Sequence, residues 1–231
     1  DEQYVKRARA HMQWMLEKYE HNGTLKHTWK NGTAKIPGKL DDYAYLVQAL
    51  LQLASASGDN KLIVKAAELV EIVMAKFSAG NGFFYYTPEG QSDIPVRKVD
   101  LYDGATPSAN AVMAHNLWIC GMCMEKSDWT EQAGEMIMNM TDTVVRYSYS
   151  IGYWAQMVQK YLRGMKTVVC TGKDAIEYVK TMQLNLLPQA HIVALSNNSY
   201  VDSMGSNIIR SVFPASFENM RKQIASVLSE N

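Results

Sequence analysis

The sequence has only three cysteines among its 231 residues, too few and of the wrong parity for a disulfide framework. It also lacks any apolar run near the roughly 18 to 20 residues that a membrane-spanning helix requires. The opening residues, Asp1-Glu2-Gln3-Tyr4, have no signal-peptide character. We therefore expect a cytoplasmic protein with no membrane partner. Because the chain starts without Met, we also expect it to be part of a longer protein.

The chain also has no formal net charge, since its 23 Lys and Arg residues balance its 23 Asp and Glu residues. A protein whose main partner is nucleic acid needs a clustered basic surface, so we expect no nucleic-acid partner. Hydrophobic residues make up 47% of the chain, which is ordinary for a globular protein with a sizeable core.

What is present is a succession of helical patterns. Apolar residues recur at helical spacing over residues 4–20, 42–57, 60–77, 106–126, 128–147 and 152–163. We expect a loop over residues 22–39 and a short extended stretch over residues 83–86. Residues 87–105 form a long loop, and loops of that length are usually functional or disordered.

Two of these helices differ in their expected burial. The helix from Thr106, with Thr as N-cap and Pro107 at its first position, is apolar on nearly every side and should be surrounded by protein. The helix from Asn60 carries charged residues on one side, which we expect to be solvated. Such alternation of inner and outer helices is typical of a two-layer helical toroid, but a plain helical bundle gives the same pattern.

The pattern changes after Lys166. Residues 167–170 and 191–195 predict two strands, with a helix over residues 174–186 between them. This order indicates a parallel pair of strands joined by a crossover helix and packed on the helical body. We expect a loop over residues 196–212 and a terminal helix over residues 214–229.

Two segments of the chain resemble a known family. They are Leu40-Asp41-Asp42-Tyr43-Ala44 and Asp103-Gly104-Ala105-Thr106-Pro107-Ser108-Ala109-Asn110, supported by Gly82-Phe83-Phe84 and Arg97. With the order of the helices and the closing β-α-β pattern, they resemble the helical C-terminal region of thioredoxin-domain-containing proteins related to spermatogenesis-associated protein. The resemblance covers about residues 1 to 195 of this chain. Ala109 departs from it, because the family usually has Gly there.

This resemblance implies an upstream thioredoxin-like domain, absent here, and then an (α/α)6 toroid similar to those of N-acylglucosamine 2-epimerase, cellobiose epimerase and the six-hairpin glycosidases. The helices predicted here are too few to close such a ring. We therefore expect a mainly α fold, with about half of the toroid over residues 1–165 and a β-α-β appendage over residues 166–231. An open half-toroid exposes inner-helix surface, so we expect a homodimer or another chain covering that face.

Two functions from different classes fit this fold. The toroid resemblance implies a carbohydrate-binding protein, in the manner of a sugar epimerase or glycosidase. The alternative is a non-catalytic interaction domain attached to a thioredoxin-like redox module. Fold alone does not establish activity, so whether the chain is an enzyme stays open at this point.

Asp41 and Asp42 open a predicted helix. Adjacent helical side chains point about 100° apart, so these two cannot flank one glycosidic bond as an acid–base pair. One of them would then cap the helix while the other stabilises its positive end. Asp42 also continues the apolar face of Leu46, which favours a position facing a toroid funnel. Our candidate catalytic residues are Asp42 and Asp103.

The candidate substrate-binding residues lie near the long loop and at the first motif. They are Arg97, Tyr102, Asn110, Tyr43 and Trp29, the last on an early loop with His27. Forked donors, an acceptor and an aromatic face suit a sugar. The alternative is a loop pinned by an internal Arg97–Asp103 ion pair.

The remaining candidates are better explained by packing. His115 lies at helical spacing with Trp118, and we interpret it as a core histidine. Cys120 and Cys123 fall late in an apolar helix, whereas a redox pair favours a helix N-terminus, and no second ligand pair exists for zinc. We expect neither a metal nor a cofactor.

Overall fold

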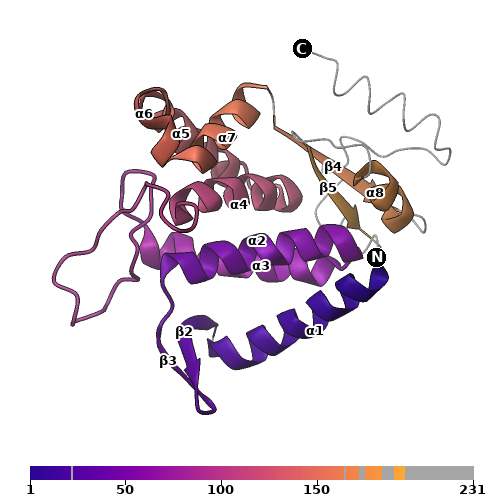
Figure 1. The fold of residues 1–231 in the computed structure, drawn as a ribbon, viewed down its shortest axis with the longest axis horizontal. Coiled ribbons are helices and arrows are strands. Elements are labelled where there is room, and N and C mark those ends of the chain that lie inside the picture. Colours follow the sequence, from indigo (N-terminus) through magenta and orange to yellow (C-terminus); the bar gives the residue numbers. More distant parts are fainter. Residues whose placement is uncertain (22, 164, 172–174, 184–189, 196–231) are drawn as a thin grey trace.

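The computed structural model describes residues 1–21, 23–163, 165–171, 175–183 and 190–195, and these form a mainly helical protein with a few short strands (Figure 1). This confirms the mainly α fold. No helix within these ranges is both long and apolar enough to cross a membrane.

The N-terminal segment contains a helix and a small antiparallel sheet. Helix α1 (Glu2–Tyr19) is followed by β1 (Glu20–His21), β2 (Thr24–Lys30) and β3 (Thr33–Pro37) in the order β1-β2-β3. The prediction of a loop over residues 22–39 is therefore wrong, because most of this segment forms strands. Asn31 and Gly32 both have positive φ, at 51° and 76°, which suits the tight turn of a two-residue hairpin. Trp29 and His27 lie on strand β2, not on a loop.

Two helical hairpins form the centre of the molecule. Helices α2 (Leu40–Ser57) and α3 (Asn60–Phe77) make the first, and α4 (Ala109–Met124) and α5 (Ser127–Asn139) make the second. The hairpins lie against each other through α2 and α4 (Figure 1). Helix α4 is buried on nearly every side, which confirms its expected central position.

The structure corrects two predicted helix boundaries. Helix α4 begins at Ala109 with Ser108 as its N-cap, not at Thr106, because the segment before it is held in a separate turn in which the Gly104 amide donates to the Thr106 carbonyl. The single helix expected over residues 128–147 divides into α5 and α6 (Thr141–Tyr147). At the break the Thr141 hydroxyl donates to the Met138 carbonyl, a local bond that competes with the helical ladder.

The C-terminal part of the described chain confirms the β-α-β prediction. A short 3-10 turn (Ser148–Ser150) and α7 (Gly152–Leu162) lead into β4 (Lys166–Thr171), α8 (Ala175–Gln183) and β5 (Ala190–Leu195). The two strands are parallel, with Thr167 opposite His191. The predicted loop over residues 196–212 and the helix over residues 214–229 lie outside the described residues.

This β-α-β unit packs on the C-terminal end of α2. The Ser55 hydroxyl donates to the Ile192 carbonyl, and Gly58, the left-handed C-cap of α2, lies against Ile176 of α8. One small apolar cluster fills the space between β4, β5 and α8, while Val193 joins the main core of the helical body. Strand β5 therefore contributes to both cores.

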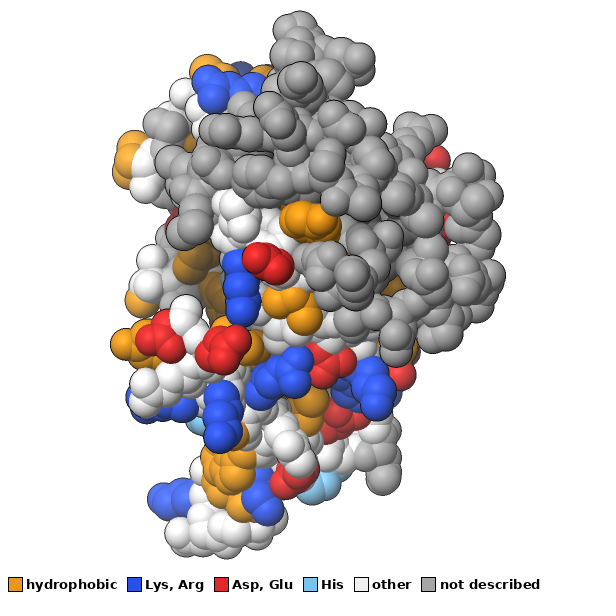
Figure 2. Space-filling model, turned by 90° about the vertical axis from the view of Figure 1, so that its right-hand side faces the viewer, with side chains coloured by type: hydrophobic (Ala, Val, Ile, Leu, Met, Phe, Trp, Pro, Cys, Tyr) orange, Lys and Arg blue, Asp and Glu red, His pale blue; other side chains and the backbone are white. Residues whose placement is uncertain are grey.

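Figure 2 shows the face that includes the N-terminal side of the molecule, where acidic and basic side chains alternate over the described surface. Some of these opposite charges form ion pairs, as Arg9 does with Asp59 and Lys65 does with Glu20. The described part of this face therefore carries no block of one charge.

Candidate functional site

The long segment between α3 and α4 is attached to the N-terminal end of α2. The Leu40 amide donates to the Tyr86 carbonyl over 2.9 Å, and the Tyr86 amide donates to the Lys98 carbonyl over 2.7 Å. Isolated bridges pair Ser78 with Phe84 and Tyr85 with Val99, which confirms a short extended stretch here. The segment extends outward beside the N-terminal ends of α2 and α4 (Figure 1).

Asn110 holds this segment against α4 from a fully buried position. Its side-chain amide donates to the carbonyls of Phe84 (3.0 Å) and Asp100 (2.9 Å), and its oxygen accepts from the Phe84 amide (2.8 Å). With these three bonds, the side chain is occupied by the backbone, and the position of Asp100 depends on it.

Asp103 connects two helix N-termini. One carboxylate oxygen accepts from the Ser108 amide at the start of α4 (2.8 Å), and the other accepts from the Tyr153 amide at the start of α7 (3.0 Å). A carboxylate is favourable at each positive helix end. Both oxygens of this predicted catalytic residue thus bind backbone amides.

Arg97 ties the long segment to the C-terminal end of α3. Its guanidinium donates to the Thr87 carbonyl (3.0 and 2.8 Å) and to the Lys76 carbonyl (2.9 Å), and it lies 4.2 Å from the centre of the Tyr85 ring. Arg97 and Asp103 therefore bind separate backbone groups, and the ion pair considered between them is not formed.

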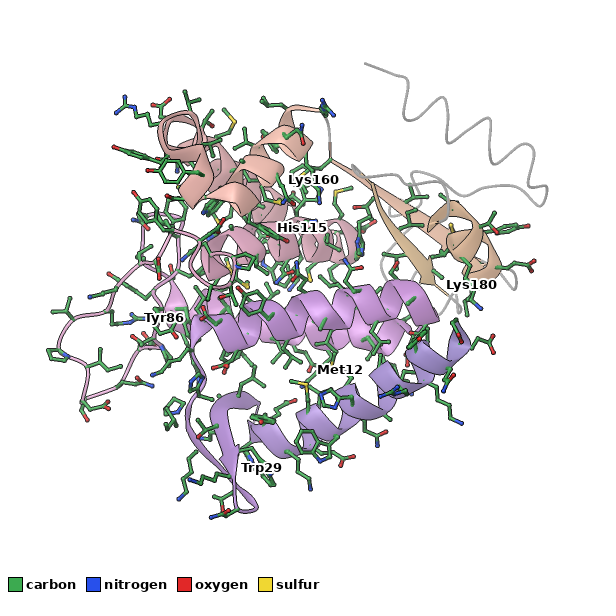
Figure 3. The ribbon with its side chains drawn as sticks, viewed as in Figure 1. Met12, Trp29, Tyr86, His115, Lys160 and Lys180 are labelled. Atoms are coloured by element: carbon green, nitrogen blue, oxygen red, sulfur yellow. The ribbon has the colours of Figure 1, made fainter. Side chains whose placement is uncertain are left out.

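Asp42 lies at the third position of α2 and closes a capping box. One of its carboxylate oxygens contacts the Lys39 amide (2.7 Å) and Nδ1 of His27 (2.8 Å). The neighbouring Tyr43 is buried, and its hydroxyl accepts from the Leu25 amide (2.9 Å). Both side chains attach the hairpin to α2. Trp29, with the Lys18 ammonium 5.6 Å from its ring centre, lies on that hairpin (Figure 3).

A polar pocket of about 100 Å³ lies where the ends of α2 and α4 meet the long segment. Its notable side chains are Asp41, Tyr86, Asp100 and Tyr102, and we call it the acidic pocket. Of the predicted site residues, the structure brings Tyr102 and Asn110 to this pocket, and Asn110 is already bonded to the backbone. Asp41 lines this pocket, and Asp42 does not.

Asp41 differs electrostatically from its neighbours. Burial, followed by the nearby charges of Asp42 and Asp100, raises the pKa of its carboxyl, and His27 opposes this only in part. Its side chain makes no hydrogen bond to another residue of the described chain, whereas Asp100 accepts from the Tyr102 amide over 3.3 Å. Both carboxylate oxygens of Asp41 are therefore available in this pocket, whereas one oxygen of Asp100 is already bonded.

Sequence reasoning missed Asp41, Asp100 and Tyr86. The sequence did contain one indication for Asp41. An acidic residue at the third position of a helix typically closes a capping box, and Asp42 takes that position if the helix begins at Leu40. Assigning Asp42 to that position leaves Asp41 about 100° around the helix. Nothing in the sequence pattern indicates that residues 86 and 100 lie at the same helix end.

His115, which we expected to be a core histidine, is partly buried and bonded to a residue of α7. Its Nδ1 lies 3.1 Å from the Tyr153 hydroxyl, and that hydroxyl accepts a hydrogen bond from the Gln48 side-chain amide over 2.7 Å. Burial, with smaller contributions from Lys160 and His191, lowers the pKa of His115 to about 3. The ring is therefore neutral at pH 7.

Cys120 and Cys123 are buried in α4 and free of disulfides. Burial raises the pKa of Cys123 to about 12 and that of Cys120 well above its usual range. The thiolate, which is the reactive form, is thus disfavoured at both positions. Within the described ranges, no group of three or more His, Cys, Asp or Glu side chains is arranged to hold a metal ion.

With this geometry in place, the chain can be compared with known proteins. No model of a known protein family matches it. It is 29% identical over 162 residues to spermatogenesis-associated protein 20 of Rattus norvegicus, a match covering 69% of this chain and 20% of that protein. The human protein of the same name is 28% identical over 147 residues, covering 63% and 19%.

A third relative is an uncharacterized protein, B0495.5, of Caenorhabditis elegans, 27% identical over 191 residues and matched over 79% of this chain and 26% of its own length. The chain thus spans about a fifth to a quarter of the curated relatives it matches. It is homologous to part of spermatogenesis-associated protein 20, in agreement with the resemblance found in the sequence.

Proposed function

We propose that this chain is part of an (α/α) toroid and binds carbohydrate in the acidic pocket. The observation that carries the proposal is the contrast between Asp41 and the other polar residues of this region. Asp42, Arg97, Asp103 and Asn110 are engaged with the backbone, while Asp41 faces the pocket without a hydrogen-bond partner in the described chain.

The chemistry of the pocket suits a polyhydroxyl ligand. Carboxylates of Asp41 and Asp100 accept from sugar hydroxyls, and the rings of Tyr86 and Tyr102 supply aromatic faces and further hydroxyls. A volume of about 100 Å³ has room for a few hydroxyl groups. We therefore propose that the pocket holds one edge of a sugar, with the rest of the sugar outside it.

The acid of any reaction at this pocket is Asp41. Because burial raises its pKa, its carboxyl keeps a proton to a higher pH than an exposed aspartate, as a general acid requires. Asp42 and Asp103 were the catalytic candidates of the sequence, and their carboxylates stabilise helix ends here. A role in positioning the pocket fits them better than proton transfer.

The test is a thermal-unfolding screen of the chain with free sugars, N-acylated sugars and disaccharides. A ligand that binds only the folded state raises the midpoint by mass action. We expect a rise with one sugar class that is lost in Asp41→Asn and kept in Asp93→Asn, an exposed carboxylate on the same long segment. A rise that survives Asp41→Asn removes the acidic pocket as the site.

A second candidate function is an interaction domain that positions a thioredoxin-like module. The observation that favours it is the same set of backbone bonds, since Arg97, Asp103 and Asn110 use their polar groups to build a fixed surface loop. A sugar panel without effect on the folded chain, together with a complex with a thioredoxin-like module on a sizing column, would support this second function.

A further inference from the structure

Three basic residues from separate elements lie within electrostatic reach of one another in the described fold. They are His115 on α4, Lys160 on α7 and His191 on β5, and we call them the basic cluster. Their charges act on one another, because Lys160 and His191 both affect the ionisation of His115, and Lys160 affects that of His191. Figure 3 shows His115 on α4 with Lys160 above it on α7.

Local geometry explains why α7 directs Lys160 to His115. Residues seven apart in a helix are separated by about two turns and share a face. Tyr153 lies seven residues before Lys160, and its hydroxyl is 3.1 Å from Nδ1 of His115. The face of α7 that carries Lys160 is therefore the face turned toward His115.

The alternation of β5 directs His191 to the same region. Ile192 and Ala194 pack with α8 in the small cluster, whereas Val193 belongs to the main core. Side chains alternate along a strand, so His191 shares the side of Val193 and faces the helical body. Its register partner Thr167 lies on that side too.

Within the described chain, the basic cluster has no acidic partner. None of the ion pairs there involves His115, Lys160 or His191, and Lys160 forms no hydrogen bond with a described residue. Nε2 of His191 and the Thr167 hydroxyl are buried without a hydrogen-bond partner. Buried polar groups are normally satisfied, so these unpartnered donors need an explanation.

Burial disfavours the charged forms of these groups. Burial lowers the pKa of His191 to about 4 and that of Lys160 below its usual range, and Lys160 adds to the effect on His191. A negative group placed among these residues would reverse this effect and accept from donors that are otherwise unpartnered. His115 and Lys160 are only partly buried.

We propose that His115, Lys160 and His191 form a binding site for a small oxyanion, either a sulfate-like or phosphate-like group or the carboxylate of a ligand. Tyr153 and Thr167 supply hydroxyl donors at its edge, and Gln48 of α2 orients Tyr153. This site is separate from the acidic pocket and does not rest on the carbohydrate proposal.

The experiment is calorimetric titration of the 231-residue chain with sodium sulfate, with sodium acetate as the carboxylate arm and sodium chloride at equal ionic strength as the blank. We expect saturable binding of sulfate or acetate above the blank, and the stronger of the two identifies the geometry of the anion. Lys160→Met should weaken it by about tenfold or more, since it removes one charged partner. Lys180→Met, at an exposed lysine on α8, is the matched control.

A second readout separates the site from general salt effects. Binding should strengthen between about pH 8 and about pH 6 with uptake of protons, because the anion favours the charged forms of His115 and His191 beside Lys160 and Tyr153. If Lys160→Met does not fold, His191→Asn should reduce the proton uptake instead, because only His115 then remains to take up a proton. Equal heats for sulfate, acetate and chloride, or undiminished affinity in both variants, would overturn the proposal and assign the unpartnered donors to water.

Discussion

The carboxylate of Asp103 accepts a hydrogen bond from the Tyr153 amide over 3.0 Å, 50 residues away in the chain. Its other oxygen binds the Ser108 amide, so one side chain caps both α4 and α7. This relationship joins the starts of α4 and α7 and fixes the loop that carries Tyr102. The first prediction follows from it.

We predict that Asp103→Ala lowers the free energy of unfolding by about 2 kcal/mol, because two helix caps are lost and each contributes about 1 kcal/mol. Urea denaturation followed by circular dichroism measures the change. Asp93→Ala, at an exposed position of the same long segment, should leave stability within about 0.5 kcal/mol of the parent. Equal stability of the two variants would show that Asp103 does not hold the helices together.

The contact between Gly58 and α8 gives a second prediction. Gly58 has a φ of 70°, and a Cβ there would lie 2.6 Å from Cγ1 of Ile176. Gly32 has a similar φ of 76° with open space around it. We expect Gly32→Ala to cost about 1 kcal/mol from backbone strain and Gly58→Ala to cost about 1 kcal/mol more from the clash. Similar losses in urea denaturation would mean that α8 does not pack on Gly58.

Stability should fall in mild acid because of two histidines. The pKa is lowered from 6.5 to about 3 for His115 and to about 4 for His191, chiefly by burial. Below pH 6.5 the unfolded chain therefore binds protons that the folded chain does not, and stability is lost as the pH falls toward these values. We expect each histidine to account for about 2 kcal/mol of the difference between pH 8 and pH 5.

His115→Gln tests this assignment when unfolding is measured in chloride at both pH values. The difference between them should shrink by about 2 kcal/mol in this variant. His11→Gln, at an exposed position on α1, should leave it unchanged. An unaltered difference in His115→Gln would place the acid sensitivity elsewhere.

The fourth prediction concerns self-association, because the half-toroid interpretation expects a homodimer or another chain to cover its open face. Large apolar side chains are exposed on α6 and the turn after it, with Val145 81% and Tyr149 89% accessible. Exposed apolar residues grouped in this way mark an interaction surface. We expect sedimentation velocity to show a concentration-dependent dimer that weakens in Val145→Ser/Tyr149→Ser without loss of thermal stability. A monomer at every concentration tested would contradict both the dimer and this surface.

Local signals in the sequence were sufficient for most of the elements. The range of α3 and the parallel β-α-β order follow from apolar periodicity and from the shift to β-branched residues. Asn31-Gly32 marks a turn in a loop and in a hairpin alike, and the residues on either side of it pair as strands β2 and β3. Thr106-Pro107 gives a strong local signal for a helix start, but α4 begins at Ala109 because Asp103 fixes its start by a contact that needs the folded loop.

The sequence by itself determined that this is a mainly helical chain with a small parallel sheet, because periodicity and capping are encoded within a few residues. It also determined the homology to part of spermatogenesis-associated protein 20. Only the tertiary structure decided which polar residues are available. Asp41 and Asp42 are adjacent in the chain, yet one faces a pocket and the other closes a capping box. The basic cluster joins three elements, and contacts between distant segments depend on how the helices pack.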